Sequence, residues 1–138
     1  MKKLAYYISL LLIAFVANGC GGNNQKLTGT VTFTDDGSPL NAGTVIFECD
    51  GKSGRGEIGP DGKFQVGFNS DKDGIPKGGT YKVTIVNAQK DEGLNKSGMS
   101  IMTPLIDKKY SDPNRSGFTF TADGKTTTMD LKVDRFVK

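Results

Sequence analysis

The chain has 138 residues, a formal net charge of +3, 36% hydrophobic residues and no histidine. This length accommodates a single domain of ordinary size. Without histidine the chain cannot form a Ser-His or Cys-His nucleophile pair, and it lacks the commonest metal ligand. The composition therefore argues against an enzyme, and we expect neither catalytic residues nor a cofactor.

The first nineteen residues have the layout of a bacterial export signal. Two lysines precede an apolar run over residues 4–17, and small residues lead to Cys20. Lipoprotein processing attaches a diacylglyceryl group to a cysteine in this place and cleaves before it, so we predict a signal peptide over 1–19 and lipidation of Cys20. Ala17 and Asn18 depart from the preferred lipobox, which leaves plain secretion open. A retained anchor is disfavoured because fourteen apolar residues fall short of the roughly 20 that span a bilayer.

Cleavage before Cys20 leaves 119 residues, in which sixteen basic side chains face fifteen acidic ones, a net charge of +1. This balance gives no reason to expect a nucleic acid as partner. Two or three acyl chains give stable membrane attachment, so the expected partner at Cys20 is a membrane. We expect the body to lie in the cell envelope, in the periplasm or at the cell surface. An outer membrane is favoured in a two-membrane cell, because Gly21 stands where an inner-membrane retention signal has Asp.

Residues 20–26 comprise the cysteine and a small polar segment, which we expect to be a flexible tether. The folded domain is predicted over 27–138. Its one cysteine, Cys49, has no partner for an intramolecular disulfide once Cys20 carries lipid. Because Cys49 alternates in step with Val45 and Phe47, we expect a buried, unreactive thiol.

Seven segments of this domain alternate apolar and polar residues, which is typical of strands with one buried face. The first covers 27–34, where four threonines alternate with Leu27, Gly29, Val31 and Phe33. The others cover 44–49, 55–58, 63–68, 81–86, 118–121 and 126–133, with turn residues between them. Seven short strands without helical periodicity predict an all-β fold, a seven-stranded antiparallel β-sandwich.

The predicted core consists of the apolar side chains on one side of each strand. Its members are Val31, Phe33, Val45, Phe47, Phe64, Val66, Tyr81, Val83, Ile85, Phe118, Phe120 and Leu131.

Residues 87–117 interrupt this pattern with about thirty residues in which no strand is predicted. The segment contains an apolar group that a solvated loop would not need: Met99, Ile101, Met102, Leu105 and Ile106. Two interpretations are open. The group packs on the sandwich and caps an open edge, or it borders a surface for a ligand or partner.

One local motif has the spacing of a calcium-binding loop. Asn69, Asp71 and Asp73 alternate before Gly74, as in the first half of such a loop. The twelfth position is Thr80 where a bidentate Glu is required, and strands flank the loop instead of helices. We therefore interpret the motif as a polar turn, with calcium as the weaker alternative and no other metal expected.

Several pieces of the sequence resemble a known family. They are GTVTF, DGSPL and GTVIF within 27–47, GPDGKF at 59–64, DGIPKGGTYKVTI at 73–85, and KYSDP at 109–113 with SG at 116–117. Together they resemble small bacterial lipoproteins of the planctomycete type that carry a transthyretin-like or carboxypeptidase regulatory-like domain. The resemblance implies a prealbumin-like sandwich that serves as an accessory or binding module. It does not bring peptidase chemistry, because the His and Glu zinc ligands are missing.

These inferences predict a membrane-anchored envelope lipoprotein with a non-catalytic binding or structural domain. The expected partners are envelope proteins, peptides or glycans. The alternatives are a scaffold for envelope assembly without a small ligand and, less favoured, a hydrolase of unrecognised type. The binding candidates are Met102, in the segment over 87–117, and Tyr110 and Phe136, the aromatic residues outside the inward-facing series.

Overall fold

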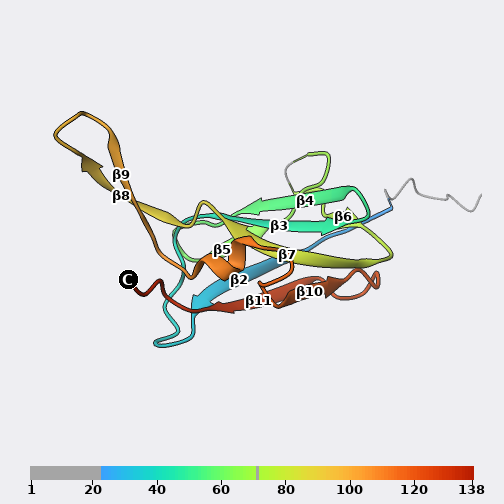
Figure 1. Cartoon of the computed structure of the whole chain (residues 1–138). Helices are drawn as coiled ribbons and strands as arrows, with labels where there is room; N and C mark the ends of the chain where they lie inside the picture. The colour runs from blue at the N-terminus through green and yellow to red at the C-terminus, as the bar shows by residue number, and fades with distance from the viewer. Residues whose placement is uncertain (1–22, 71) are drawn as a thin grey trace, which may run out of the picture.

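The computed structural model describes residues 23–70 and 72–138, and these residues form a sandwich of two β-sheets (Figure 1). The predicted signal peptide and Cys20 lie outside the described residues. One sheet has four strands in the order β10-β7-β3-β4, and the other has three in the order β11-β2-β5. All seven predicted strands are present. Their bounds are β2 (Thr28–Phe33), β3 (Thr44–Cys49), β4 (Lys52–Glu57), β5 (Lys63–Gln65), β7 (Thr80–Val86), β10 (Phe118–Thr121) and β11 (Thr128–Val133).

The all-β sandwich is confirmed, but one pair of strands in it is parallel. Strand β11 runs alongside β2 in the same direction, with Thr128 opposite Thr28 and Val133 opposite Phe33. The other pairs in both main sheets are antiparallel, as predicted. Alternation of apolar residues identifies the buried face of a strand but carries no information about its neighbour or direction, so the parallel pair could not be predicted from it.

The core lies between the two sheets and is built on aromatic contacts. The Phe47 ring, fully buried on β3, meets the Phe120 ring edge-on at 6.0 Å between centroids. The centroid of the Phe47 ring also lies 6.3 Å from that of the Phe64 ring on the opposite sheet. Of the twelve predicted core residues eleven are buried, and the twelfth, Phe118, is partly buried against the same cluster.

The domain begins earlier than predicted. Strand β1 (Asn24–Gln25) pairs with β6 (Ile75–Pro76), so residues assigned to the flexible tether belong to the folded body. The buried Gln25 side chain fixes this end: its amide NH₂ donates to the Thr126 carbonyl, and its Oε1 accepts from the Gly124 N–H at 2.7 Å. Burial of a fully hydrogen-bonded polar side chain gives no apolar periodicity, which is why the sequence pattern missed it.

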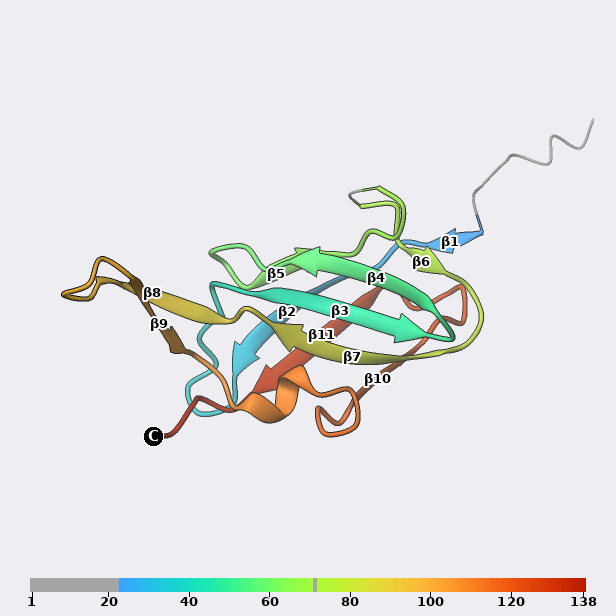
Figure 2. The ribbon, with the colours of Figure 1, turned by 45° about the horizontal axis from the view of Figure 1, so that its top comes forward.

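The prediction of no strand within 87–117 is wrong. Strands β8 (Gln89–Leu94) and β9 (Ser100–Pro104) form an antiparallel hairpin, and a short 3₁₀ helix, η1 (Lys108–Ser111), follows it. Figures 1 and 2 both show that the hairpin projects from one end of the sandwich, while β1 lies at the opposite end. The hairpin has no buried face, so its strands lack the alternation from which the others were predicted.

Candidate functional site

The projecting hairpin carries a cluster of exposed apolar side chains. Five large hydrophobic side chains are exposed within the described residues, and four of them lie between positions 94 and 102. They are Leu94 (70% exposed), Met99 (63%), Ile101 (42%) and Met102 (48%). A concentration of apolar surface on one projection marks an interaction site more than scattered residues do. We call these four residues the hairpin cluster.

The pairing of the hairpin strands distributes the cluster over both faces. Met102 lies opposite Asp91, and Ser100 lies opposite Leu94, so Met102 and Leu94 share one face of the two-stranded sheet. Ile101 points to the other face because side chains alternate along a strand. Between Asp91 and Leu94 the register shifts, and Gly93 there adopts a positive φ of 98°. This bulge bends the strand near its tip.

The expectation that the apolar group rests on the sandwich holds for only part of it. Ile106 is buried, and Leu105 packs partly against the core. Met99, Ile101 and Met102 lie beyond the body and are exposed. The group therefore caps the sandwich only through Leu105 and Ile106, and its other three side chains stay exposed.

Of the three predicted binding residues, only Met102 is exposed. Tyr110 is buried, with 4% of its surface exposed, and it stacks on Phe118 at 5.4 Å between ring centroids. Phe136 is half-buried near the C-terminus, where its backbone N–H donates to the Leu105 carbonyl. Lack of alternation around Tyr110 reflects its position in η1, where a strand period does not apply. Tyr110 thus belongs to the core.

A polar network surrounds the Tyr110 hydroxyl. The Asp134 carboxylate accepts hydrogen bonds from Lys109 at 2.7 Å, from the Thr34 hydroxyl at 2.7 Å and from the Tyr110 hydroxyl at 2.9 Å. These donors, Lys109 first, lower the pKa of Asp134 to about 2. The bond to Asp134 raises the pKa of Lys109, and burial raises that of Tyr110. The other three side chains all bond to Asp134, so the network connects the turn that follows β2, the helix η1 and the segment after β11.

The calcium motif forms a turn in which Asp73 is occupied by protein groups. Its carboxylate accepts from the backbone N–H groups of Phe68 and Asn69 and from the Asn24 side chain. The bond from Phe68 is the main cause of the lowered pKa of Asp73. Asp71 lies outside the described residues. Within 23–70 and 72–138, no three His, Cys, Asp or Glu side chains are grouped to hold a metal ion.

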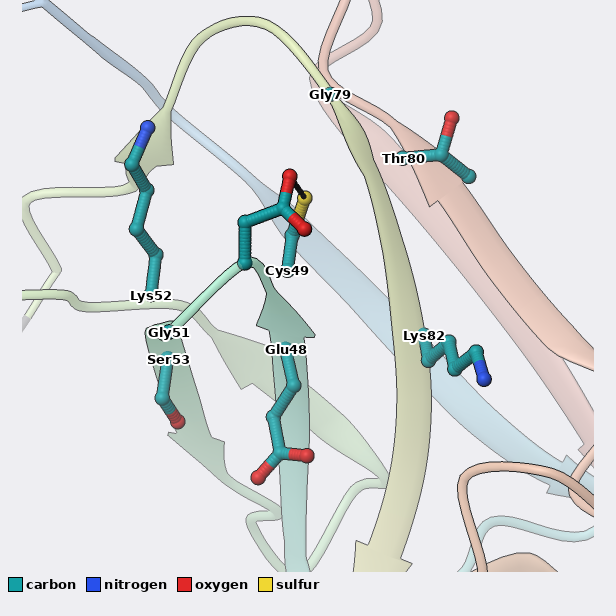
Figure 3. A pocket seen from close by; sticks show the side chains of 9 residues that line it. Glu48, Cys49, Gly51, Lys52, Ser53, Gly79, Thr80 and Lys82 are labelled. Carbon is teal, nitrogen blue, oxygen red and sulfur yellow. Dashed lines mark hydrogen bonds between the residues drawn. The ribbon is translucent and has the colours of Figure 1, made fainter.

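A pocket of about 490 Å³ opens at the turn between β3 and β4, beside the start of β7 (Figure 3). Cys49 lies in this pocket. The expectation of a buried thiol is wrong: Cys49 is half-buried, because it is the last residue of β3 and lies at the end of the sandwich. Its thiol contacts the Asp50 carboxylate at 3.7 Å. Figure 3 shows the charged ends of Glu48, Lys52 and Lys82 pointing away from one another. A site for catalysis or for a small charged ligand needs groups that converge, which these do not.

A second hollow, of about 570 Å³, lies where β2, β5 and β11 meet. Thr30 on its wall donates to Asp130 at 2.6 Å, and Phe64 contributes only a buried ring. Glycan-binding sites use exposed aromatic rings as stacking surfaces, and this hollow offers none. The hairpin cluster is therefore the surface best suited to a partner.

The part of the chain that the structure describes contains no helix long and apolar enough to cross a membrane. No family model matches the chain, and neither does any curated protein.

The solved structures that match this chain share little sequence with it, and their TM-scores are below 0.5. The major pilin subunit of Bacillus cereus is 12% identical with a TM-score of 0.45, over 81% of this chain and 30% of the pilin. A DUF3823 family protein from Bacteroides ovatus is 18% identical with a TM-score of 0.38, over 80% of this chain and 44% of that protein. A 9R-lipoxygenase from Cyanothece is 15% identical with a TM-score of 0.37, over 80% of this chain and 16% of the lipoxygenase. The chain spans less than half of each of these proteins.

Proposed function

We propose that this chain is a cell-envelope lipoprotein whose β-sandwich is a non-catalytic module for binding another protein. Two features support the proposal. The sequence before Cys20 has the layout of a lipoprotein signal, and the hairpin cluster offers exposed apolar side chains. The family resemblance of the sequence points the same way, because its transthyretin-like domains are accessory modules. The observation that carries the binding role is the hairpin cluster.

The start of the fold suggests how such an anchor would orient the body. Asn24 is the first residue of β1, only four positions after Cys20. Four residues span at most about 14 Å however they are arranged. A lipid on Cys20 would hold the β1 end close to the bilayer. The hairpin, at the opposite end of the molecule in both views, would then point away from that bilayer (Figures 1 and 2).

A protein is a better partner than a glycan for this surface. The exposed side chains of the hairpin cluster are aliphatic or thioether groups, which bury well against other apolar side chains. They cannot supply the flat aromatic surface or the dense hydrogen bonds that sugars require. An assembly scaffold without a small ligand would use the same protein-binding surface.

Fractionation of cells tests the anchor. Replacing Cys20→Ser should abolish labelling by a fatty-acid analogue and move the chain out of the membrane fraction or leave an unprocessed precursor. Cys49→Ser is the matched control, because it removes the chain's other thiol, and it should leave labelling and membrane association unchanged. Undiminished labelling of the Cys20→Ser chain would refute the proposed lipidation.

A further inference from the structure

Two of the four residues in the hairpin cluster are methionines. Met99 and Met102 are both exposed. Of the two other methionines in the chain, Met1 belongs to the predicted signal peptide, and Met129 on β11 is half-buried against the core. Among the described residues, methionine sulfur is therefore readily accessible at the hairpin cluster and nowhere else.

We propose that Met99 and Met102 form a modification site at which hydrogen peroxide converts each thioether to a sulfoxide. A sulfur–oxygen bond forms as the oxygen–oxygen bond of the peroxide breaks. The sulfur loses two electrons, and the second oxygen leaves as water with both protons. Methionine sulfoxide reductases reverse the change, with thiols as the source of two electrons and the oxygen released as water. The modification is therefore reversible.

The backbone of the hairpin does not depend on either sulfur atom. The Asn95 N–H donates to the Met99 carbonyl at 2.8 Å, and the Met99 N–H donates to the Asn95 side-chain oxygen at 3.0 Å. Met102 is held opposite Asp91 by the pairing of β9 with β8. The hairpin projects clear of the sandwich, so an added oxygen at either position lies in solvent (Figures 1 and 2). Oxidation should therefore leave the fold and its stability unchanged.

Met129 offers a comparison within the same chain. It lies opposite Gly29 in the parallel pair of β11 and β2, and it packs partly against the core. Covered sulfur meets an oxidant less often than exposed sulfur, and an added oxygen would disturb close packing. Met99 is 63% exposed and Met102 is 48% exposed. The structure thus predicts that Met99 reacts first, Met102 second and Met129 last.

Oxidation changes what the hairpin cluster can bind. A thioether is apolar and polarisable, whereas a sulfoxide is polar. A partner that covers a sulfoxide without a hydrogen bond removes its water, which weakens a complex by about tenfold or more. Leu94 and Ile101 have no sulfur, so the two methionines determine whether the cluster stays apolar throughout. This consequence rests on the proposed function, whereas the oxidation itself does not.

Peptide mass spectrometry tests the order of reaction. The full-length chain carries Cys49→Ser to remove the free thiol of the folded domain. It is purified as cells process it and treated with dilute hydrogen peroxide. Met99 and Met102 should be converted while Met129 remains largely unmodified, and a sulfoxide reductase with a thiol should restore both. Equal rates at the three positions, or a first reaction at Met129, would overturn the site.

Thermal unfolding followed by circular dichroism tests whether the fold is independent of the modification. The oxidised chain should keep the melting temperature of the untreated chain. A chain with Met99→Leu and Met102→Leu is the matched control, because leucine has a similar volume and no oxidisable sulfur. A melting temperature that falls on oxidation of the unaltered chain, but not of this control, would show that the two sulfurs support the fold and overturn the proposal.

Cross-linking in cells tests the effect on binding. Lys90 and Lys96 on the hairpin supply exposed amines for formaldehyde. Peroxide should lower the yield of cross-linked product by about tenfold or more for the unaltered chain, and not for the double leucine variant. An equal decrease in both chains would overturn the effect on binding. Absence of any product from untreated cells would overturn that effect together with the proposed function, while the oxidation site would still be judged by its reaction rates.

Discussion

The Tyr110 hydroxyl makes two hydrogen bonds with one residue. It donates to the Asp134 carboxylate at 2.9 Å and accepts from the backbone N–H of Asp134 at 3.0 Å. The ring beneath it stacks on Phe118. One side chain thus links the 3₁₀ helix that follows the hairpin to the chain after β11 and to strand β10. We infer that Tyr110 fixes the base from which the hairpin projects.

Replacing Tyr110→Phe should therefore destabilise the domain without leaving a cavity in its core. The ring and its stacking remain, but the Asp134 N–H loses its acceptor, and the free energy of unfolding should fall by about 1–2 kcal/mol. Urea denaturation followed by tyrosine fluorescence or circular dichroism measures this change. Thr119→Ala, an exposed change on the neighbouring strand β10, is the control and should stay within about 0.5 kcal/mol. An unaltered midpoint for Tyr110→Phe would show that the two bonds contribute nothing.

A larger loss of unfolding free energy is expected from a substitution in the core, at Phe47. This ring is completely buried between Phe64 and Phe120, so Phe47→Ala removes aromatic contacts from both sheets and leaves a cavity. The expected loss is about 3–5 kcal/mol, a large share of the stability of a domain this size. If the chain does not fold at all, the milder Phe47→Leu variant should show a loss of the same sign. A loss below about 1 kcal/mol for Phe47→Ala would contradict the assigned packing.

The core strands could be predicted from the sequence because apolar residues occupy every second position along each of them. Val45 and Phe47 on β3, or Tyr81, Val83 and Ile85 on β7, are apolar at alternate positions, and all five are buried. The physical requirement that one face avoid water dictates both the residue types and their spacing. The sandwich follows from seven such strands.

Elements whose stability does not depend on one buried face could not be predicted in this way. Strand β1 is held by the hydrogen bonds of Gln25, and the hairpin exposes both of its faces. Tyr110 is buried from a 3₁₀ helix that is too short to show a period. The candidate site could be predicted only coarsely: the hairpin cluster lies within the segment 87–117, but only Met102 of the three predicted binding residues is exposed.

Acid should destabilise the fold over a defined range of pH. The pKa of Asp36, Asp123 and Asp134 is lowered from 3.8 to about 2 by hydrogen bonds, chiefly from Ser38, Thr126 and Lys109 respectively. A carboxylate with a lower pKa in the folded than in the unfolded chain stabilises the fold above the unfolded value. That stabilisation is lost as the pH falls through the folded value, so stability should decrease from about pH 4 to about pH 2.

Urea midpoints measured across this range test the assignment. Asp134→Asn cannot ionise at this position, so its stability should be lower at neutral pH and should fall less steeply below about pH 4 than that of the unaltered chain. Asp91→Asn, on the exposed hairpin, is the matched control and should keep the full slope. A midpoint that stays constant from about pH 4 to about pH 2 would contradict a role for these carboxylates in folding.

Gly29 allows two neighbouring strands to approach β2 closely. A Cβ atom at this position would lie 1.9 Å from the Met129 carbonyl oxygen on β11 and 2.5 Å from the Phe64 ring on β5. Because a backbone oxygen cannot move aside cheaply, Gly29→Ala should force the strands apart and cost about 1–3 kcal/mol or more. Thr30→Ala, the next residue, is the control: its side chain points to the outer face, and the change removes only an exposed hydrogen bond to Asp130. Equal midpoints for the two variants in urea denaturation would show that β11 does not pack against β2 as closely as the parallel pairing requires.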